Sequence, residues 1–124
     1  MDGKLENKVY FYKESIVIVE ISGEFSVFVQ DYELLYKEML AYIKMGIFCY
    51  IMNLNGLSYI DSSGVGVIMR LAANAAKHTT LVCVICDQPQ ILRILGMMNV
   101  DKIVHFVKDI DEGIAYFKSK DFIE

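Results

Sequence analysis

The sequence predicts an α/β fold built on a small, mostly parallel sheet. Short apolar runs of strand length alternate along the chain with segments of helical periodicity. Two of those runs, 47–54 (IFCYIMNL) and 79–86 (TTLVCVIC), are continuously apolar, which is typical of strands buried on both faces of a parallel sheet. The length of 124 residues suits one domain, and neither a linker nor an internal repeat interrupts it. We therefore expect a single domain over residues 1–124.

The N-terminal third of the chain predicts a β-hairpin followed by a helix. The runs 8–13 (KVYFYK) and 15–22 (SIVIVEIS) are rich in β-branched and aromatic residues, and Glu14 alone separates them. We expect two adjacent strands there. From Phe28 to Met45, apolar residues recur at steps of three and four, which predicts an amphipathic helix that Gly46 ends.

The middle of the chain predicts a strand, a loop and a second helix. Residues 55–60 (NGLSYI) indicate turns, so we expect a long loop over residues 53–66 after the strand at 47–54. The helix then runs to about His78. Three good N-cap residues, Asp61, Ser62 and Ser63, mark its start.

The C-terminal part predicts a strand, a helix, a strand and a final helix. The strand 79–86 leads to a helix opened by Pro89, a residue favoured in the first helical turn. A short strand at 103–107 (IVHFV) follows. The pattern from Asp109 to Glu112 is that of a capping box and predicts the last helix. Strands that alternate with helices indicate right-handed crossovers between parallel neighbours.

Charge and composition exclude several function classes. The 12 Lys and Arg residues against 16 Asp and Glu give a net charge of −4, with no basic cluster, so we expect no nucleic-acid partner. Residues 1–8 lack the apolar stretch of a signal peptide. The longest uncharged segment, 45–60, is too short and too polar to span a bilayer. We expect a cytoplasmic protein with no membrane insertion.

Cys49, Cys83 and Cys86 all lie in apolar runs. Cys83 and Cys86 have CxxC spacing, but residues three apart in a strand point to opposite faces. No second such pair and no histidine pair completes a zinc site. We interpret the three cysteines as buried thiols and expect no metal or other cofactor.

The loop before the second helix is the candidate functional site, because ligands of parallel α/β sheets bind at the carboxyl ends of strands. Its Gly64-Val-Gly66 segment lacks the third glycine of a dinucleotide-binding loop, and no GK[ST] follows. The glycine that GxSxG requires two residues before the serine is absent for both serines, and His78 and His105 are poorly placed as bases. We therefore expect no enzyme.

Two interpretations of the loop stay open from the residues alone. Asp61, Ser62 and Ser63 could simply cap the helix, an effect of about 1 kcal/mol. One serine could instead be phosphorylated, adding about −1.5 to −2 charges beside free N–H groups at the positive end of the helix. A partner docked over the loop would then meet new bulk and charge next to Asp61, so such a serine would switch binding.

The segment 53–66 (NLNGLSYIDSSGVG) resembles the signature of bacterial anti-sigma factor antagonists, the STAS domain family. The likeness extends to residues 23–25 (GEF), 86–95 (CDQPQILRIL) and 101–106 (DKIVHF), and so covers nearly the whole chain. It implies a STAS-like βα superhelix around a small mixed sheet.

The resemblance also implies a phosphorylation switch. The serine directly after the aspartate, Ser62 here, would be the phosphoacceptor of an anti-sigma factor that is itself a serine kinase. Asp61 would be its acidic neighbour, with Ser63 and Gly64 completing the partner-binding loop. The unphosphorylated form would sequester the anti-sigma factor and free a sigma factor, and a PP2C-type phosphatase would reset the switch.

The sequence departs from the family pattern near the partner surface. Switch members usually carry an aspartate after the Gly-Glu-Leu segment, where this chain has Ser26 followed by apolar residues. We include Glu24 and Ser26 among the predicted partner-binding residues. The departure keeps open a non-phosphorylated STAS interaction module in a larger signalling or transport assembly, and a nucleotide-binding domain is the less favoured alternative.

Two smaller expectations follow from the same residues. Asn99 stands where the family favours glycine after the third helix, and asparagine tolerates the left-handed conformation needed there. A second copy of the chain could pair over the tyrosine-rich N-terminal face, so a homodimer stays open.

Overall fold

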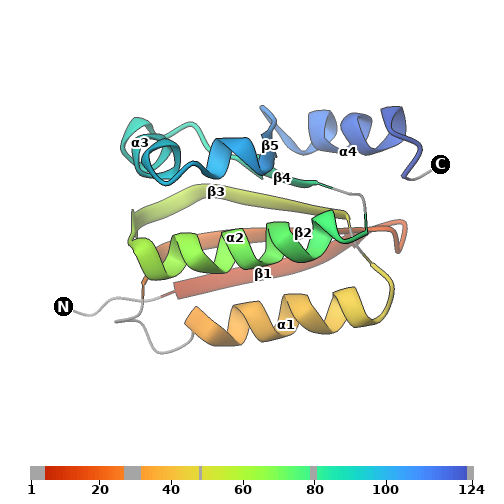
Figure 1. Cartoon of the computed structure of the whole chain (residues 1–124), viewed down its shortest axis with the longest axis horizontal. Coiled ribbons are helices and arrows are strands. Elements are labelled where there is room, and N and C mark those ends of the chain that lie inside the picture. Colours follow the sequence, from red (N-terminus) through yellow and green to blue (C-terminus); the bar gives the residue numbers. More distant parts are fainter. Residues whose placement is uncertain (1–4, 27–31, 48, 79–80, 123–124) are drawn as a thin grey trace.

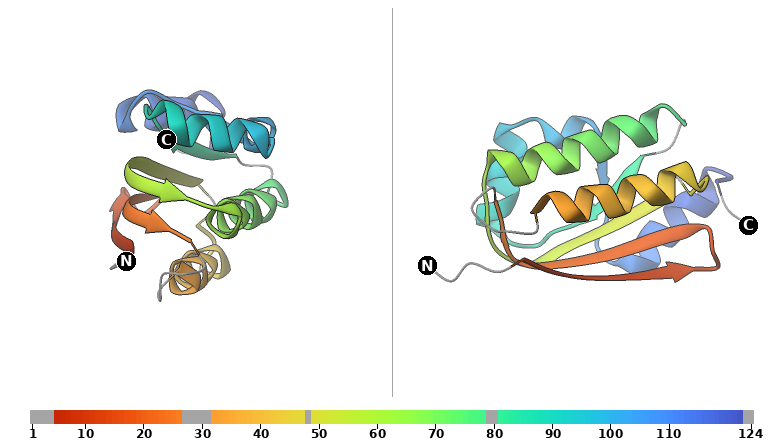
Figure 2. Two further views of the ribbon diagram at one scale, coloured as in Figure 1. Left: turned by 90° about the vertical axis from the view of Figure 1, so that its left-hand side faces the viewer. Right: turned by 90° about the horizontal axis from the view of Figure 1, so that it is seen from below.

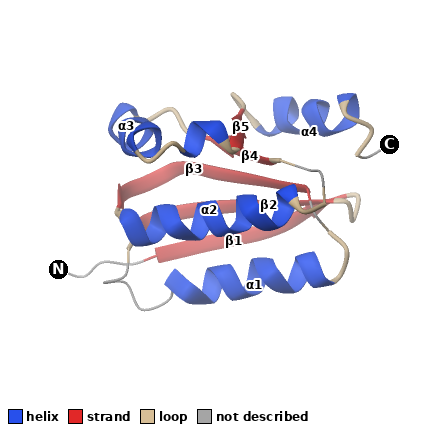
Figure 3. Cartoon of the chain, viewed as in Figure 1, coloured by secondary structure: helices blue, strands red, loops and turns tan. Residues whose placement is uncertain are grey.

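The computed structural model describes residues 5–26, 32–47, 49–78 and 81–122. In this part of the chain, five strands form one sheet with helices packed on it (Figures 1 and 3). The strands are β1 (Leu5–Tyr12), β2 (Ile16–Phe25), β3 (Cys49–Ile60), β4 (Val82–Ile85) and β5 (Val104–Phe106). The helices are α1 (Tyr32–Lys44), α2 (Ser62–Ala76), α3 (Pro89–Met97), the 3-10 helix η1 (Val100–Lys102) and α4 (Ile110–Ser119).

The sheet has the order β1-β2-β3-β4-β5, with β1 antiparallel to β2 and all other neighbours parallel. The predicted α/β class and the mixed, mostly parallel sheet are therefore confirmed. The N-terminal hairpin is confirmed too, and its turn is closed by the N–H of Ser15, which donates to the carbonyl of Tyr12 at 3.0 Å. The predicted start of the first helix, at Phe28, lies outside the described residues.

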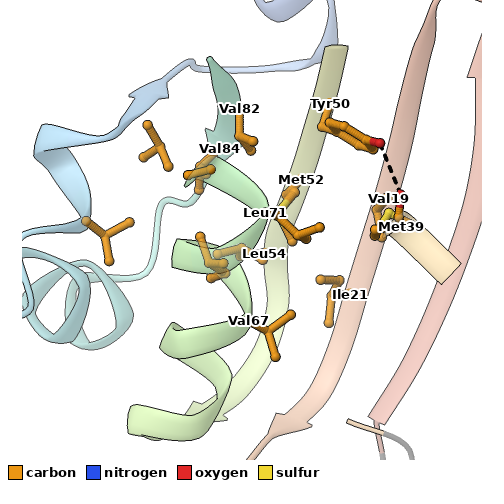
Figure 4. Close-up of a cluster of buried hydrophobic side chains, with 14 of the residues drawn as sticks. Val19, Ile21, Met39, Tyr50, Met52, Leu54, Val67, Leu71, Val82 and Val84 are labelled. Atoms are coloured by element: carbon orange, nitrogen blue, oxygen red, sulfur yellow. Dashed lines mark hydrogen bonds between the residues drawn. The ribbon is translucent and has the colours of Figure 1, made fainter. Parts of the chain in front are cut away.

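The first face of the sheet carries the larger core. Helices α1 and α2 lie side by side across this face (Figures 1 and 2), and α3 completes its cover. Alternate side chains of β2 and β3, among them Val19 and Met52, meet Leu71 of α2 there (Figure 4). This packing fixes α2, and with it the helix start that bears the candidate site, against the centre of the sheet.

A buried tyrosine fastens α1 to β3 within this core. The side chain of Tyr50 is 0 % exposed, and its hydroxyl lies 3.1 Å from the carbonyl of Met39 and 2.9 Å from that of Ile47 (Figure 4). The single hydroxyl proton is shared between two acceptors, of which the Met39 bond is buried and the Ile47 bond part-buried, so the buried hydroxyl is satisfied.

The second face carries a smaller core beneath α4, built around Ile18, Ile51 and Phe117. Cys49 and Cys83 are buried in it, whereas the half-buried Cys86 packs against the other core. The divergence of the two CxxC thiols is therefore confirmed. Burial raises the pKa of Cys49 to about 11 and that of Cys83 to about 12.

The predicted loop over residues 53–66 is wrong, because β3 continues to Ile60 and only Asp61 separates it from α2. The register explains the error. Glu20 pairs with Asn53 and Ser22 with Gly56, so β3 contains an extra residue, and a second shift follows before Tyr59. These bulges break the strict alternation that identifies a strand, and the segment 55–60 therefore has the sequence pattern of turns.

Three helix-end predictions fare better. Pro89 is the first residue of α3, as predicted, and Asn99 is left-handed with φ 61°. Asp109 caps α4, because its Oδ1 accepts the N–H of Glu112 at 2.8 Å. The return bond of the capping box is displaced by one residue, since the Glu112 carboxylate accepts from the N–H of Lys108.

No helix in the described residues is both long enough and apolar enough to cross a membrane. Within the same residues, no cluster of three or more His, Cys, Asp or Glu side chains could hold a metal ion.

Candidate functional site at the N-terminus of α2

Asp61 starts α2 and organises its first turn. It has extended backbone angles, φ −117° and ψ −174°, and its Oδ1 accepts the N–H groups of Ser63 at 2.9 Å and Gly64 at 3.1 Å. The predicted helix start is therefore confirmed. Of the three candidate caps, Asp61 is the N-cap, and Ser62 and Ser63 are the first two helical residues.

The same bonds correct one expectation about a phosphate at this position. The N–H groups of Ser63 and Gly64 are not free, because the Asp61 carboxylate already holds both. A phosphate on Ser62 would therefore stand beside a carboxylate and would not take over these donors. It would remain dependent on water for its hydrogen bonds.

The end of β2 lies directly against this helix start. The N–H of Asp61 donates to the carbonyl of Phe25 at 3.2 Å. A Cβ atom on Gly64 would lie 2.2 Å from that same oxygen and 2.9 Å from Cγ1 of Ile60. Glycine at position 64 is thus required by close approach of the backbone of β2, which brings the end of β2 beside the start of α2.

The structure places the predicted partner-binding residues on two adjoining elements. Asp61, Ser62, Ser63 and Gly64 form the start of α2, and Glu24 lies half-buried on β2. The Ser26 side chain is only 1 % exposed. It therefore presents no surface to a partner in this structure, and its role in binding stays a prediction.

Ser62 and Ser63 differ in exposure. Ser62 is exposed, whereas Ser63 is half-buried. An enzyme must reach the hydroxyl of a serine to modify it, and Ser62 meets that condition better than its neighbour does.

Tyr59 is an exposed aromatic residue that the sequence analysis did not single out. It lies two residues before the cap and is 46 % exposed, opposite Glu24 in the β2–β3 register. Because residues 55–60 have the sequence pattern of turns, the direction of the Tyr59 side chain could not be predicted from the sequence. An aromatic residue next to a strong helix cap was the available signal.

The nearby cation Arg70 is engaged elsewhere. Its guanidinium lies 4.4 Å from the ring centroid of Tyr36 on α1, and its Nε donates to the carbonyl of Gly66 at 3.4 Å. Eight residues of helix separate Arg70 from Ser62, about 12 Å along the axis. The charge directly beside Ser62 is therefore the negative one of Asp61.

Neither histidine can serve as a base for these serines. His78 follows the far end of α2, about 24 Å along the helix axis from Ser62. His105 lies on β5 and stacks on Tyr116, with ring centroids 4.1 Å apart. Neither serine therefore forms a nucleophile–base pair with a histidine.

The fold and this helix start define a small α/β protein with a serine held at the capped N-terminus of a helix. The family model of the STAS domain matches residues 11–113. The chain belongs to the STAS domain family, as its resemblance in the segment 53–66 implied.

Solved structures share this fold at low sequence identity. An anti-sigma factor antagonist from Mycobacterium paratuberculosis is 16% identical with a TM-score of 0.79, over 92% of this chain and 94% of that one. The unphosphorylated anti-sigma factor antagonist SpoIIAA is 15% identical with a TM-score of 0.77, over 96% of this chain and 100% of that one. The phosphorylated form of Bacillus SpoIIAA is 17% identical with a TM-score of 0.72, over 90% and 98%.

Proposed function

We propose that this protein is a non-enzymatic anti-sigma factor antagonist whose partner binding is controlled at Ser62. In its unphosphorylated form it sequesters an anti-sigma factor that is also a serine kinase. The observation that carries the proposal is the placement of an exposed Ser62 directly after the capping Asp61, in a chain of the STAS family. A structural neighbour, SpoIIAA, exists in both unphosphorylated and phosphorylated forms.

The local geometry gives phosphorylation a physical effect on binding. Two backbone donors of the first turn, the N–H groups of Ser63 and Gly64, already bond to Asp61. The phosphate would add about −1.5 to −2 charges beside that carboxylate and would need water around it. A partner bound over the start of α2 would have to displace this water, which is costly for an uncompensated charge. Phosphorylation therefore weakens binding, and removal of the phosphate by a PP2C-type phosphatase restores it.

The fold itself tolerates the modification. Ser62 is exposed at the first helical position, where negative charge interacts favourably with the helix dipole by about 0.3–1 kcal/mol. The switch therefore acts at the surface and not by unfolding the domain. A partner of this kind acts on transcription, so we place the protein in the cytoplasm.

The test uses the purified serine-kinase anti-sigma factors of the source genome, each titrated against wild type, Ser62→Ala and Ser62→Asp. We expect one of them to bind wild type and Ser62→Ala, to bind Ser62→Asp at least about tenfold more weakly, and to phosphorylate wild type at residue 62. Ser63→Ala is the matched control and should keep both binding and phosphorylation. Equal binding of all four proteins would contradict the switch.

The alternative is a constitutive STAS interaction module in a larger signalling or transport assembly. The observation that favours it is Ser26, which is buried and uncharged where switch members of the family usually carry an aspartate. Intact-mass measurement of protein from its own cells separates the two proposals. Stoichiometric absence of phosphate in several growth states, together with unchanged partner binding by Ser62→Asp, would support the constitutive module.

A nucleotide-binding role has less support. The segment 64–66 lacks the third glycine of a dinucleotide-binding loop, and the N–H groups of Ser63 and Gly64, which could otherwise hold a phosphate, already bond to Asp61. An increase in melting temperature with millimolar GTP or ATP would support nucleotide binding, and no increase would contradict it.

A further inference from the structure

Six large apolar or aromatic side chains are exposed in the described part of the chain, and Tyr59 differs from the rest in its location. The others lie on β1, on or directly after α1, and on α3: Phe11, Leu34, Met45, Leu92 and Met97. Tyr59 alone among the six lies on the segment that leads into α2. It lies three positions before Ser62, so their Cα atoms are at most about 11 Å apart.

The backbone of Tyr59 is held in place by the strand beside it. Tyr59 pairs with Glu24 in the β2–β3 ladder, and the hydroxyl of the preceding Ser58 donates to the carbonyl of Gly23 at 3.1 Å. An aromatic side chain on a rigid strand has few torsions to lose, so its burial by a partner costs little conformational entropy.

An interface centred on Ser62 is wide enough to include Tyr59. A specific interface buries about 800 Å² on each side, which corresponds to a patch roughly 30 Å across. Both residues fall within such a patch when it is centred on the start of α2. Tyrosine is also among the residue types that most often contribute the largest share of binding energy.

We propose that Tyr59 is the principal anchor for the protein partner of this STAS domain. The partner surface that fits is an apolar pocket for the phenol ring, with one polar group for its hydroxyl. The inference rests on the proposed function, because it takes the surface around Ser62 as the docking site. It adds Tyr59 as the residue that contributes most of the affinity and an apolar pocket as the partner surface that binds it.

The anchor also accounts for the sensitivity of binding to phosphate. An apolar pocket closed over Tyr59 excludes water within reach of the Ser62 side chain. A phosphate there would lose hydration without gaining the N–H groups of Ser63 and Gly64, which Asp61 already holds. Tyr59 and Ser62 would therefore act in one contact region. Tyr59 would increase the affinity for the partner, and a phosphate on Ser62 would decrease it.

The experiment is a calorimetric titration with the purified serine-kinase anti-sigma factors of the source genome. We expect Tyr59→Ala to weaken binding at least about tenfold and Tyr59→Phe, which keeps the ring, to stay within about threefold of wild type. Phe11→Ala is the matched control. Phe11 has the same 46 % exposure but pairs with Val17, seven positions along β2 from the partner of Tyr59. It should stay within about twofold.

Each result decides the inference. A tenfold loss for Tyr59→Ala with an unchanged Phe11→Ala supports it, provided that circular dichroism shows both variants folded. Equal affinities of Tyr59→Ala and wild type overturn the anchor and leave the proposed function intact. Equal losses for Tyr59→Ala and Phe11→Ala also overturn it. Binding of wild type to none of the anti-sigma factors overturns the proposed function and the anchor together.

Discussion

The carbonyl oxygen of Phe25 lies 2.2 Å from the position that a Cβ atom on Gly64 would occupy. The same oxygen accepts the N–H of Asp61 at 3.2 Å. The end of β2 is thus in close contact with the first turn of α2, and only glycine allows it. This contact sets the position of the serine-bearing turn relative to Glu24 and Tyr59.

Gly64→Ala should destabilise the fold. The added methyl group would overlap a backbone atom that cannot move aside cheaply, and overpacking of this kind costs about 1–3 kcal/mol. The matched control is Gly66→Ala in the same helix, where no atom lies within 4 Å of the new Cβ. The control should be neutral or more stable by up to about 1 kcal/mol, because alanine favours the helix. Urea unfolding of both variants is the measurement, and equal stabilities would contradict the close contact.

Asp61→Ala should cost about 0.5–2 kcal/mol of unfolding free energy, because it removes the acceptor of two helix N–H groups. Asp61→Asn should retain most of that stability, since an amide oxygen caps equally well. The comparison isolates the charge of Asp61 from its capping role. Thermal unfolding of the two variants checks this, with Asp109→Ala in α4 as a second cap whose loss should have a similar cost. A fully stable Asp61→Ala would show that the cap contributes nothing.

Tyr50→Phe should lower the unfolding free energy by about 0.5–1.5 kcal/mol, the net value of a typical hydrogen bond. The change removes the hydroxyl that the carbonyls of Met39 and Ile47 share. The Met39 carbonyl keeps its helical partner within α1, so the loss falls mainly on the part-buried carbonyl of Ile47. Tyr42→Phe is the control, because the Tyr42 hydroxyl donates to an exposed Glu38 carboxylate that water can satisfy instead. Chemical denaturation should show a loss in the first variant and a change within about 0.5 kcal/mol in the second.

The sequence pattern predicted most of this fold because most of its elements obey simple periodicities. The buried N-terminal half of β3 is a continuous apolar run, and Asp61 is a preferred N-cap residue, so both could be identified from the local sequence. The C-terminal half of β3 does not. Its bulges depend on pairing with β2, a strand about 35 residues earlier, and no local pattern contains that information.

The sequence predicted the capping aspartate and the serine of the candidate site, but it did not predict the residues packed around them. Ser62 and Asp61 are adjacent in sequence, so the motif placed them together. The contact of Gly64 with Phe25 and the burial of Ser26 depend on tertiary packing of β2 against α2. Tyr59 was hidden for the same reason, since its orientation follows from the irregular register of β3.

Replacing Lys13 and Glu14 by Asn and Gly should stabilise the N-terminal hairpin. Both residues have positive φ angles, 49° and 62°, which non-glycine residues rarely adopt. Asn-Gly is the preferred pair for a tight hairpin turn with this backbone. We expect a gain of about 1 kcal/mol in the free energy of unfolding. A lower melting temperature for the double variant would show that the two side chains contribute contacts outweighing the strain.

Stability should fall steeply in alkali. Burial raises the pKa of Cys49 to about 11 and that of Cys83 to about 12. Burial, followed by the hydrogen bond to Glu20, raises the pKa of Tyr10 to about 12. The folded state thus keeps protons that the unfolded chain releases near pH 9 for thiols and pH 10 for tyrosine. By linkage, the unfolded state binds fewer protons above pH 9, so the free energy of unfolding decreases from there to about pH 12.

Urea midpoints at half-unit steps from pH 8 to pH 11, in the presence of a reductant, measure this decline. Cys83→Ala removes one of the buried thiols, so its midpoint should depend less on pH than that of wild type, although its stability at pH 8 is lower because of the cavity. Cys86→Ala is the matched control, since Cys86 is only half-buried, and it should keep most of the wild-type slope. A wild-type midpoint that stays constant up to pH 11 would show that the thiols of Cys49 and Cys83 ionise without opposing the fold.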